Sequence, residues 1–89
     1  ITYSRGKWRV SMKKFKVLLN SINDVKGFVN AAGSQMCDID IVSGRYTVDA
    51  KSIMGIFSLD LSKPIAVEFH GSDEEAEAFM ALVRNNVVE

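Results

Sequence analysis

The sequence is poor in the side chains on which many enzyme and metal sites depend, since its 89 residues include one cysteine and one histidine. A single cysteine cannot form a disulfide within the chain, which favours a reducing, cytoplasmic location over secretion. One histidine and one cysteine also fall short of the about four such ligands that structural zinc requires. We therefore predict no metal site and no other cofactor.

The sequence also lacks a net charge of either sign and a long apolar run. The 11 basic residues balance the 11 acidic ones, so overall charge favours neither nucleic acid nor a membrane surface. No apolar run approaches the roughly 18 residues of a membrane span, and no signal peptide is evident. We predict a small globular monomer with no direct nucleic-acid contact and no membrane insertion.

The first eleven residues differ in charge from the rest. Arg5, Lys7 and Arg9 are the only charged residues among them, and Met12 followed by two lysines reads as a natural start. We interpret residues 1–11 as an upstream or cloning-derived N-terminal extension and residues 12–89 as the domain. The alternative is a genuine arm whose Trp8 packs on the domain.

Four segments alternate apolar and polar residues with the period of a β-strand. They are residues 14–20, 37–41, 45–50 and 65–69. Ser43-Gly44 is a tight-turn signal between the second and third segments, which therefore form a hairpin.

Three segments have apolar residues at helical spacing behind a serine that can cap a helix. The first follows Ser21 and stops near Gly33, the second spans residues 51–59 with Ser52 as its cap, and the third starts at Ser72. Glu75, three residues after Ser72, completes a capping-box signature. The residues at helical spacing in the first segment are Ile22, Val25, Phe28, Val29 and Ala32, and those that share a face of the second are Ile53, Ile56 and Phe57. The predicted buried stripe of the third is Ala76, Phe79, Met80, Val83 and Val87.

The element order is therefore β-α-β-β-α-β-α. Each strand has one apolar and one polar face, which is typical of an antiparallel sheet that is covered on one side only. We predict an α+β fold, a two-layer open-faced β-sandwich in which three helices cover one face of a four-stranded antiparallel sheet.

The segment K-S-I-M-G at residues 51–55, followed by Ser58-Leu59, resembles the regulatory-serine segment of the HPr family, the histidine-containing phosphocarrier proteins of the bacterial sugar phosphotransferase system. The resemblance extends over roughly Lys13 to Val88 and includes the element order. It implies two phosphorylation sites. One is a histidine at the start of the first helix, which takes phosphate from phosphoenolpyruvate through Enzyme I. The other is a serine that a dedicated kinase phosphorylates to control catabolite repression.

The start of the first helix departs from the family pattern. Alignment through Phe28 places Ser21 at the histidine position, Asn23 at the arginine position and Asp24 at the proline position. A serine hydroxyl is a poor substitute for imidazole as a phosphoryl acceptor, and Asp24 brings a negative charge to a site that must hold an anion. We expect that phosphohistidine carrier activity is lost and that the protein is not an enzyme.

The Ser52 segment keeps the family pattern and predicts a regulatory phosphorylation site. The resemblance assigns protein binding to the residues beside the serine: Lys51, Ile53, Met54 and Phe57. A phosphate at Ser52 would add about −1.5 to −2 charge next to this apolar segment. The alternative is that Ser52 only caps a helix, that Lys51 is solvated, and that Met54 or Phe57 belongs to the core.

The predicted partners are proteins: an HPr serine kinase, a catabolite-control regulator, or Enzyme I as the target of a decoy. A different function remains open, which is an active phosphoryl carrier that uses Ser21, His70 or another substitute acceptor. We expect His70 at an exposed strand end and Cys37 as a buried, unreactive thiol. Asp38 and Asp40 are predicted on the polar face of the sheet, near lysines of the first strand.

Overall fold

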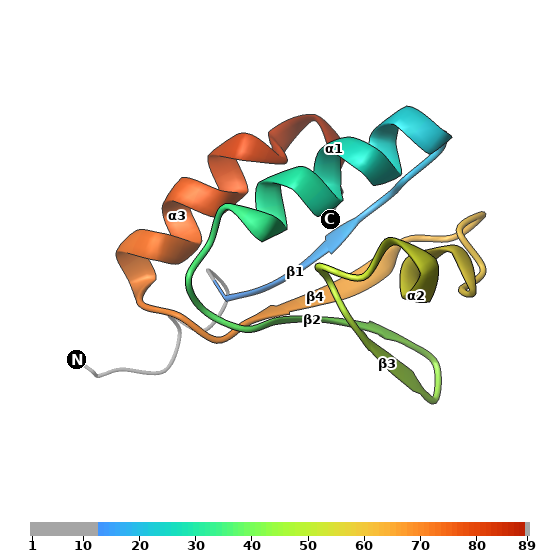
Figure 1. Cartoon of the computed structure of the whole chain (residues 1–89), viewed down its shortest axis with the longest axis horizontal. Helices are drawn as coiled ribbons and strands as arrows, with labels where there is room; N and C mark the ends of the chain where they lie inside the picture. The colour runs from blue at the N-terminus through green and yellow to red at the C-terminus, as the bar shows by residue number, and fades with distance from the viewer. Residues whose placement is uncertain (1–12, 89) are drawn as a thin grey trace.

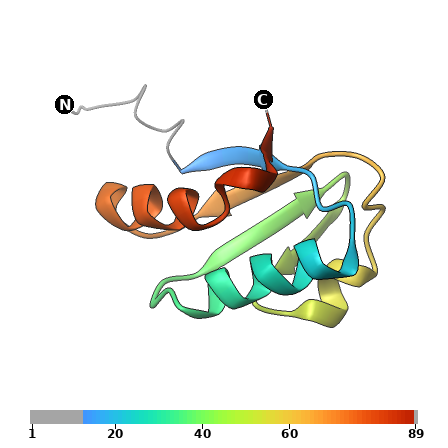
Figure 2. The same cartoon turned by 90° about the horizontal axis from the view of Figure 1, so that it is seen from above.

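A computed structural model describes residues 13–88 of the chain and confirms the α+β fold (Figure 1). The described elements, in chain order, are β1 (Lys14–Val17), α1 (Ile22–Gly33), β2 (Ile39–Ser43), β3 (Tyr46–Asp49), α2 (Ile53–Phe57), β4 (Ile65–Phe69), α3 (Asp73–Leu82), the 3-10 turn η2 (Arg84–Asn86) and β5 (Val87–Val88). The three α-helices lie on one side of the sheet (Figures 1 and 2). The predicted N-terminal extension and the position of Trp8 lie outside the described residues.

All strands pair antiparallel in the order β3-β2-β4-β1-β5. The sheet therefore has five strands where four were predicted. The fifth strand contains Val87, which was wrongly predicted on the buried stripe of the last helix. The helix ends earlier because Asn86 connects the chain to β1: its carbonyl accepts a 2.8 Å hydrogen bond from the Leu18 amide, and its side-chain amide donates to the Leu18 carbonyl. These bonds start an extended pairing that a helix could not make.

Phenylalanine rings form the centre of the core between the helices and the sheet. Phe79 of α3 is fully buried and lies 5.5 Å from the Phe69 ring of β4, 5.6 Å from the Phe28 ring of α1 and 6.3 Å from the Phe15 ring of β1, centroid to centroid. Such offset and edge contacts add to the hydrophobic stabilisation of burial. This cluster fixes α1 and α3 over the two central strands.

The hairpin and the helix starts follow the sequence signals. Gly44 lies in the two-residue turn between β2 and β3 with a φ of 61°, a conformation that suits glycine. Ser21, Ser52 and Ser72 each cap a helix and accept a hydrogen bond from the amide three residues on. The second helix is shorter than predicted, since it ends at Phe57, where the Ser58 hydroxyl donates to the Gly55 carbonyl.

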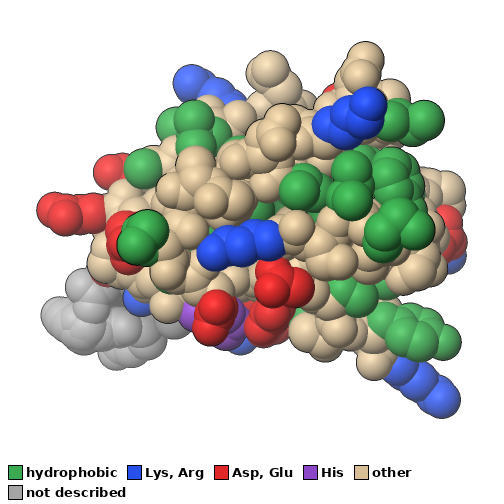
Figure 3. Space-filling view, viewed as in Figure 1, with side chains coloured by type: hydrophobic (Ala, Val, Ile, Leu, Met, Phe, Trp, Pro, Cys, Tyr) green, Lys and Arg blue, Asp and Glu red, His purple; other side chains and the backbone are tan. Residues whose placement is uncertain are grey.

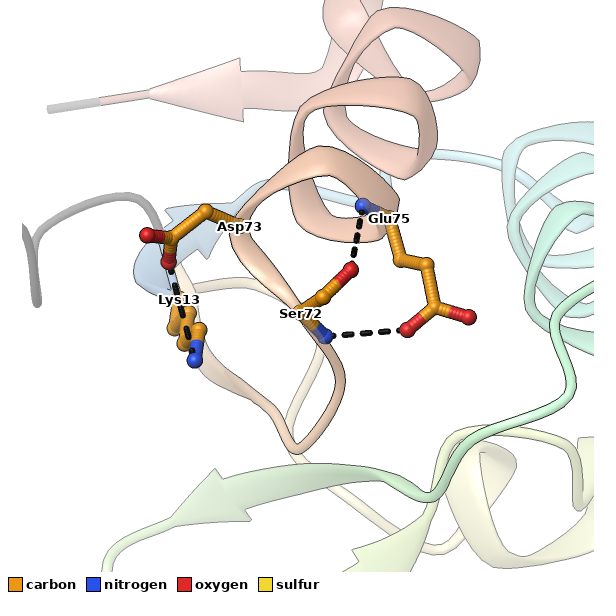
Figure 4. A network of polar contacts seen from close by, with 4 residues as sticks. All are labelled: Lys13, Ser72, Asp73 and Glu75. Carbon is orange, nitrogen blue, oxygen red and sulfur yellow. Dashed lines mark hydrogen bonds and ion pairs between the residues drawn. The ribbon is translucent and has the colours of Figure 1, made fainter.

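The capping box of α3 is complete. The Glu75 amide donates to the Ser72 hydroxyl oxygen at 3.1 Å, and the Ser72 amide donates to the Glu75 carboxylate at 2.9 Å (Figure 4). Asp73 in the same turn forms an ion pair with Lys13 at 3.6 Å. These contacts fix the start of the helix that supplies Phe79 to the core.

We expect Ser72→Ala to lower the free energy of unfolding by about 1 kcal/mol, because one helix amide loses its acceptor. Urea denaturation measures this loss as a lower midpoint with an unchanged slope. Glu77→Ala, at an exposed position of the same helix, serves as the control. Equal stability of the two variants would show that the capping box contributes nothing.

Candidate protein-binding site at the starts of α1 and α2

The first turn of α1 is closed by hydrogen bonds between neighbouring residues. The Ser21 hydroxyl accepts from the Asp24 amide at 3.1 Å, and the Asp24 carboxylate accepts from the Asn20 amide at 3.0 Å. Ser21 is exposed, but its hydroxyl oxygen already occupies the Asp24 amide, one of the first-turn amides that could otherwise hold an anion. Asp24 also adds negative charge at this point. The arrangement stabilises the start of the helix.

Ser52 lies at the start of α2 in an exposed position. Its hydroxyl oxygen accepts from the Gly55 amide at 3.1 Å, so its described hydrogen bond uses it as an acceptor. A Cβ atom at Gly55 would lie 3.1 Å from the Ser52 hydroxyl oxygen and 3.3 Å from the Val48 Cβ atom. The glycine of the K-S-I-M-G segment therefore allows α2 to approach both its own cap and β3 closely.

The side chains after Ser52 divide between surface and core. Met54 is 76% exposed and Phe57 is 41% exposed. Ile56 is fully buried, and Ile53 is half-buried and packs against the core. Of the predicted protein-binding residues, Met54 and Phe57 therefore offer the larger apolar surface, whereas Ile53 also anchors the helix.

Lys51 forms hydrogen bonds within the chain through both its side chain and its backbone amide. Its ammonium donates to the Gln35 carbonyl at 3.0 Å, and its backbone amide donates to the Asp49 carboxylate at 2.8 Å. The lysine thus connects the start of α2 to the segment that follows α1. This contact joins segments 16 residues apart and could not be predicted from local spacing.

The start of α1 and the end of α2 meet around an open cavity of about 380 Å³. Ser21 and Ile22 line it from α1, and Phe57, Leu61 and Ser62 line it from α2 and the following loop. Ile22, which falls at the helical spacing of the apolar residues of α1, is 62% exposed beside this cavity. Hydrophobic side chains gather on this part of the surface in Figure 3. We call the surface formed by Ser21, Ile22, Ser52, Met54 and Phe57 the helix-start surface.

The prediction for His70 agrees with its exposed position after β4, whereas the predicted neighbours of Asp40 were wrong. β4 lies between β1 and β2, so β2 does not border the lysines of β1. Asp40 instead contacts His70, with its carboxylate oxygen 3.0 Å from the ring Nε2 atom. The sequence pattern identified the polar face but not the strand order that places neighbours on it.

The match with a family model covers residues 9–87, and the model describes the PTS HPr component phosphorylation site. The solved structure of HPr-C-His from Thermoanaerobacter tengcongensis superposes with a TM-score of 0.67 at 26% identity, over 82% of this chain and 92% of that one. The phosphocarrier protein HPr from Bacillus anthracis is 33% identical, with a TM-score of 0.59 over 79% of this chain and 94% of its own.

The histidine-containing phosphocarrier protein of Mycoplasma shares the fold, with a TM-score of 0.64 at 16% identity over 81% of this chain and 88% of that one. No curated protein matches the sequence significantly. Within residues 13–88, no helix is long and apolar enough to span a membrane.

Cys37 is half-buried rather than fully buried. Burial raises the pKa of its thiol, and the Glu75 carboxylate adds to the rise. Because only the thiolate is alkylated, a raised pKa leaves less reactive sulfur at neutral pH.

We expect iodoacetamide to modify Cys37 of the folded chain more slowly than that of the urea-unfolded chain, with the rate rising at higher pH. Intact mass spectrometry over a pH series measures this, and identical pH profiles for both forms would contradict it.

Proposed function

Because this chain belongs to the HPr phosphocarrier family of the phosphotransferase system, we propose that it is a non-enzymatic regulatory module that binds proteins through its helix-start surface and has lost phosphohistidine transfer. Two observations together support this proposal. Ser52 is exposed beside the exposed side chains of Met54 and Phe57. The start of α1 holds Ser21 and Asp24, which are hydrogen-bonded to each other. The surface is suited to docking, and the helix start is not suited to carrying a phosphoryl group.

The loss of transfer is supported by the chemistry at α1. Phosphoryl transfer through histidine needs an imidazole nitrogen as nucleophile and a positively charged surrounding for the anion. Ser21 offers a hydroxyl without a histidine beside it, because the chain's one histidine follows β4. The core-facing residues of β4 alternate with Glu68, which places Glu68 and His70 on the face of the sheet opposite the helices.

The regulatory role is supported by the surroundings of Ser52. The serine is exposed at the edge of the apolar residues Met54 and Phe57. A phosphate would bring about two negative charges to this edge, which would weaken an apolar partner and favour one with arginine or lysine at its rim. Methionine adapts its shape to different partners, and the neighbouring cavity extends the surface toward Ile22.

We expect a bacterial HPr serine kinase with ATP to add one phosphate to the chain, and Ser52→Ala to abolish this addition. Intact mass spectrometry measures the modification. Ser58→Ala is the matched control, because Ser58 is an exposed serine at the other end of the same helix. Phosphorylation that persists in Ser52→Ala, or none in the wild-type chain, would overturn the assignment of the regulatory site.

The alternative of an active carrier is tested in a parallel reaction with Enzyme I and phosphoenolpyruvate. No gain in mass is expected, because no imidazole lies at the start of α1. A phosphate gained there and lost in Ser21→Ala or His70→Ala would establish a substitute acceptor. Inhibition of transfer to a genuine HPr without any modification of this chain would instead establish a decoy.

The docking role of Met54 has a control of the same residue type in Met36, which is 94% exposed on the loop after α1. We expect Met54→Ala to lower the kcat/KM of Ser52 phosphorylation by about tenfold, because a partner loses one apolar anchor. Met36→Ala is expected to leave this value unchanged. Equal effects of the two substitutions, measured at low substrate concentration, would contradict docking through this surface.

A further inference from the structure

The face of the sheet opposite the helices carries a row of ionisable side chains across four strands. Asp49 on β3 pairs with Asp40 on β2, Asp40 pairs with Glu68 on β4, and Glu68 pairs with Lys14 on β1. Cross-strand partners have their side chains on the same face, about 4.5–5.5 Å apart at Cβ. The row therefore places three carboxylates and one ammonium side by side, on the side of the sheet that the helices leave uncovered (Figure 1).

This arrangement is electrostatically unfavourable in the absence of a further cation. Carboxylates directly opposite one another in a sheet destabilise it, and Asp40 has one on each side. Lys14 borders only Glu68 in this row. The carboxylate of Asp49 is already engaged, since it accepts from the Lys51 amide. Within the row Glu68 has Lys14 beside it, whereas Asp40 has only carboxylates as cross-strand partners.

His70 supplies a nitrogen ligand next to these two carboxylates. Its Nε2 atom lies 3.0 Å from the Asp40 Oδ2 atom, and the side chains are 48% and 37% exposed. One ligand atom from each of Asp40, Glu68 and His70 lies within 4.8 Å of the other two. In Figure 3 the purple histidine lies beside acidic side chains at the lower edge of the molecule.

We propose that Asp40, Glu68 and His70 form a binding site for a divalent transition-metal ion such as Zn²⁺ on the open face of the sheet. Ligand atoms bound to zinc at about 2.0–2.2 Å lie roughly 3.3 Å apart in a tetrahedral site. The contact between Asp40 and His70 is close to that separation, and rotation of the half-buried Glu68 carboxylate brings the third ligand in. The fourth position faces solvent and takes water.

The ligand types select the class of metal. An imidazole nitrogen favours zinc and other first-row transition ions over magnesium and calcium, which prefer oxygen ligands. The carboxylates supply the negative charge that a divalent cation neutralises. The sequence count of one histidine and one cysteine overlooked this site because it considered only nitrogen and sulfur ligands. Glu68 lies two residues before His70 on the same face, whereas Asp40 joins them only through the strand order.

The single histidine makes the test direct. We expect calorimetric titration of the full, tag-free chain with ZnCl₂, after treatment with a chelator, to show one bound ion per chain. His70→Gln and Asp40→Asn are each expected to weaken binding by about tenfold or more, because each removes one of three ligands. Circular dichroism establishes that the exposed substitutions leave the fold intact.

Cys37→Ser separates this site from adventitious binding at the thiol and is expected to bind zinc as the wild-type chain does. Titration with Co²⁺ provides a second readout, since its visible absorption reports a nitrogen and oxygen ligand set and is expected to change in His70→Gln. Undiminished zinc binding in His70→Gln, loss of binding in Cys37→Ser, or no binding by the wild-type chain would overturn the proposal. None of these outcomes bears on Ser52 phosphorylation, so the two proposals fail independently.

Discussion

The packing of Phe79 against three other phenylalanines is the contact on which the rest of the structure depends. The rings of Phe15, Phe28 and Phe69 come from β1, α1 and β4, so one side chain of α3 holds together both layers of the fold. Because this cluster lies on one side of the sheet, the helices and their N-terminal ends lie in the layer on that same side. Among residues 13–88 no helix covers the opposite side, which bears Lys14, Asp40 and Glu68, and the two proposed sites lie on different layers for this reason.

The sequence predicts the parts of this fold that local spacing determines. Alternation identified the four long strands, and a serine before each helix identified its start, because both depend on residues close in the chain. The strand β5 and the helix-start cavity were missed. β5 depends on hydrogen bonds between Asn86 and Leu18, which lie 68 residues apart. Ile22 fits the helical spacing of α1, and its 62% exposure beside the cavity does not follow from that spacing.

The candidate sites show the same limit. Ser52, Met54 and Phe57 are adjacent in sequence, so their shared surface was accessible to sequence reasoning, whereas the engagement of Lys51 with Gln35 was not. Asp40, Glu68 and His70 fall on two strands whose adjacency follows only from the order β2-β4-β1. A prediction that paired Asp40 with the lysines of β1 had the correct face and the wrong neighbour, because alternation determines faces and tertiary pairing determines neighbours.

At the start of α1, the requirements for forming the helix differ from the requirements for carrying a phosphoryl group. A helix there needs an acceptor for its first amides, and the Ser21 hydroxyl oxygen provides one for the Asp24 amide, while the Asp24 carboxylate accepts from the Asn20 amide just before the helix. Phosphoryl transfer needs the opposite condition, with free amides and a positively charged surrounding. On the proposed function, replacing an imidazole by a serine therefore preserves the helix and the core above β1 while removing the transfer chemistry. The Ser52 segment is then free to serve regulation, because its contacts with Gly55 and β3 do not involve the start of α1.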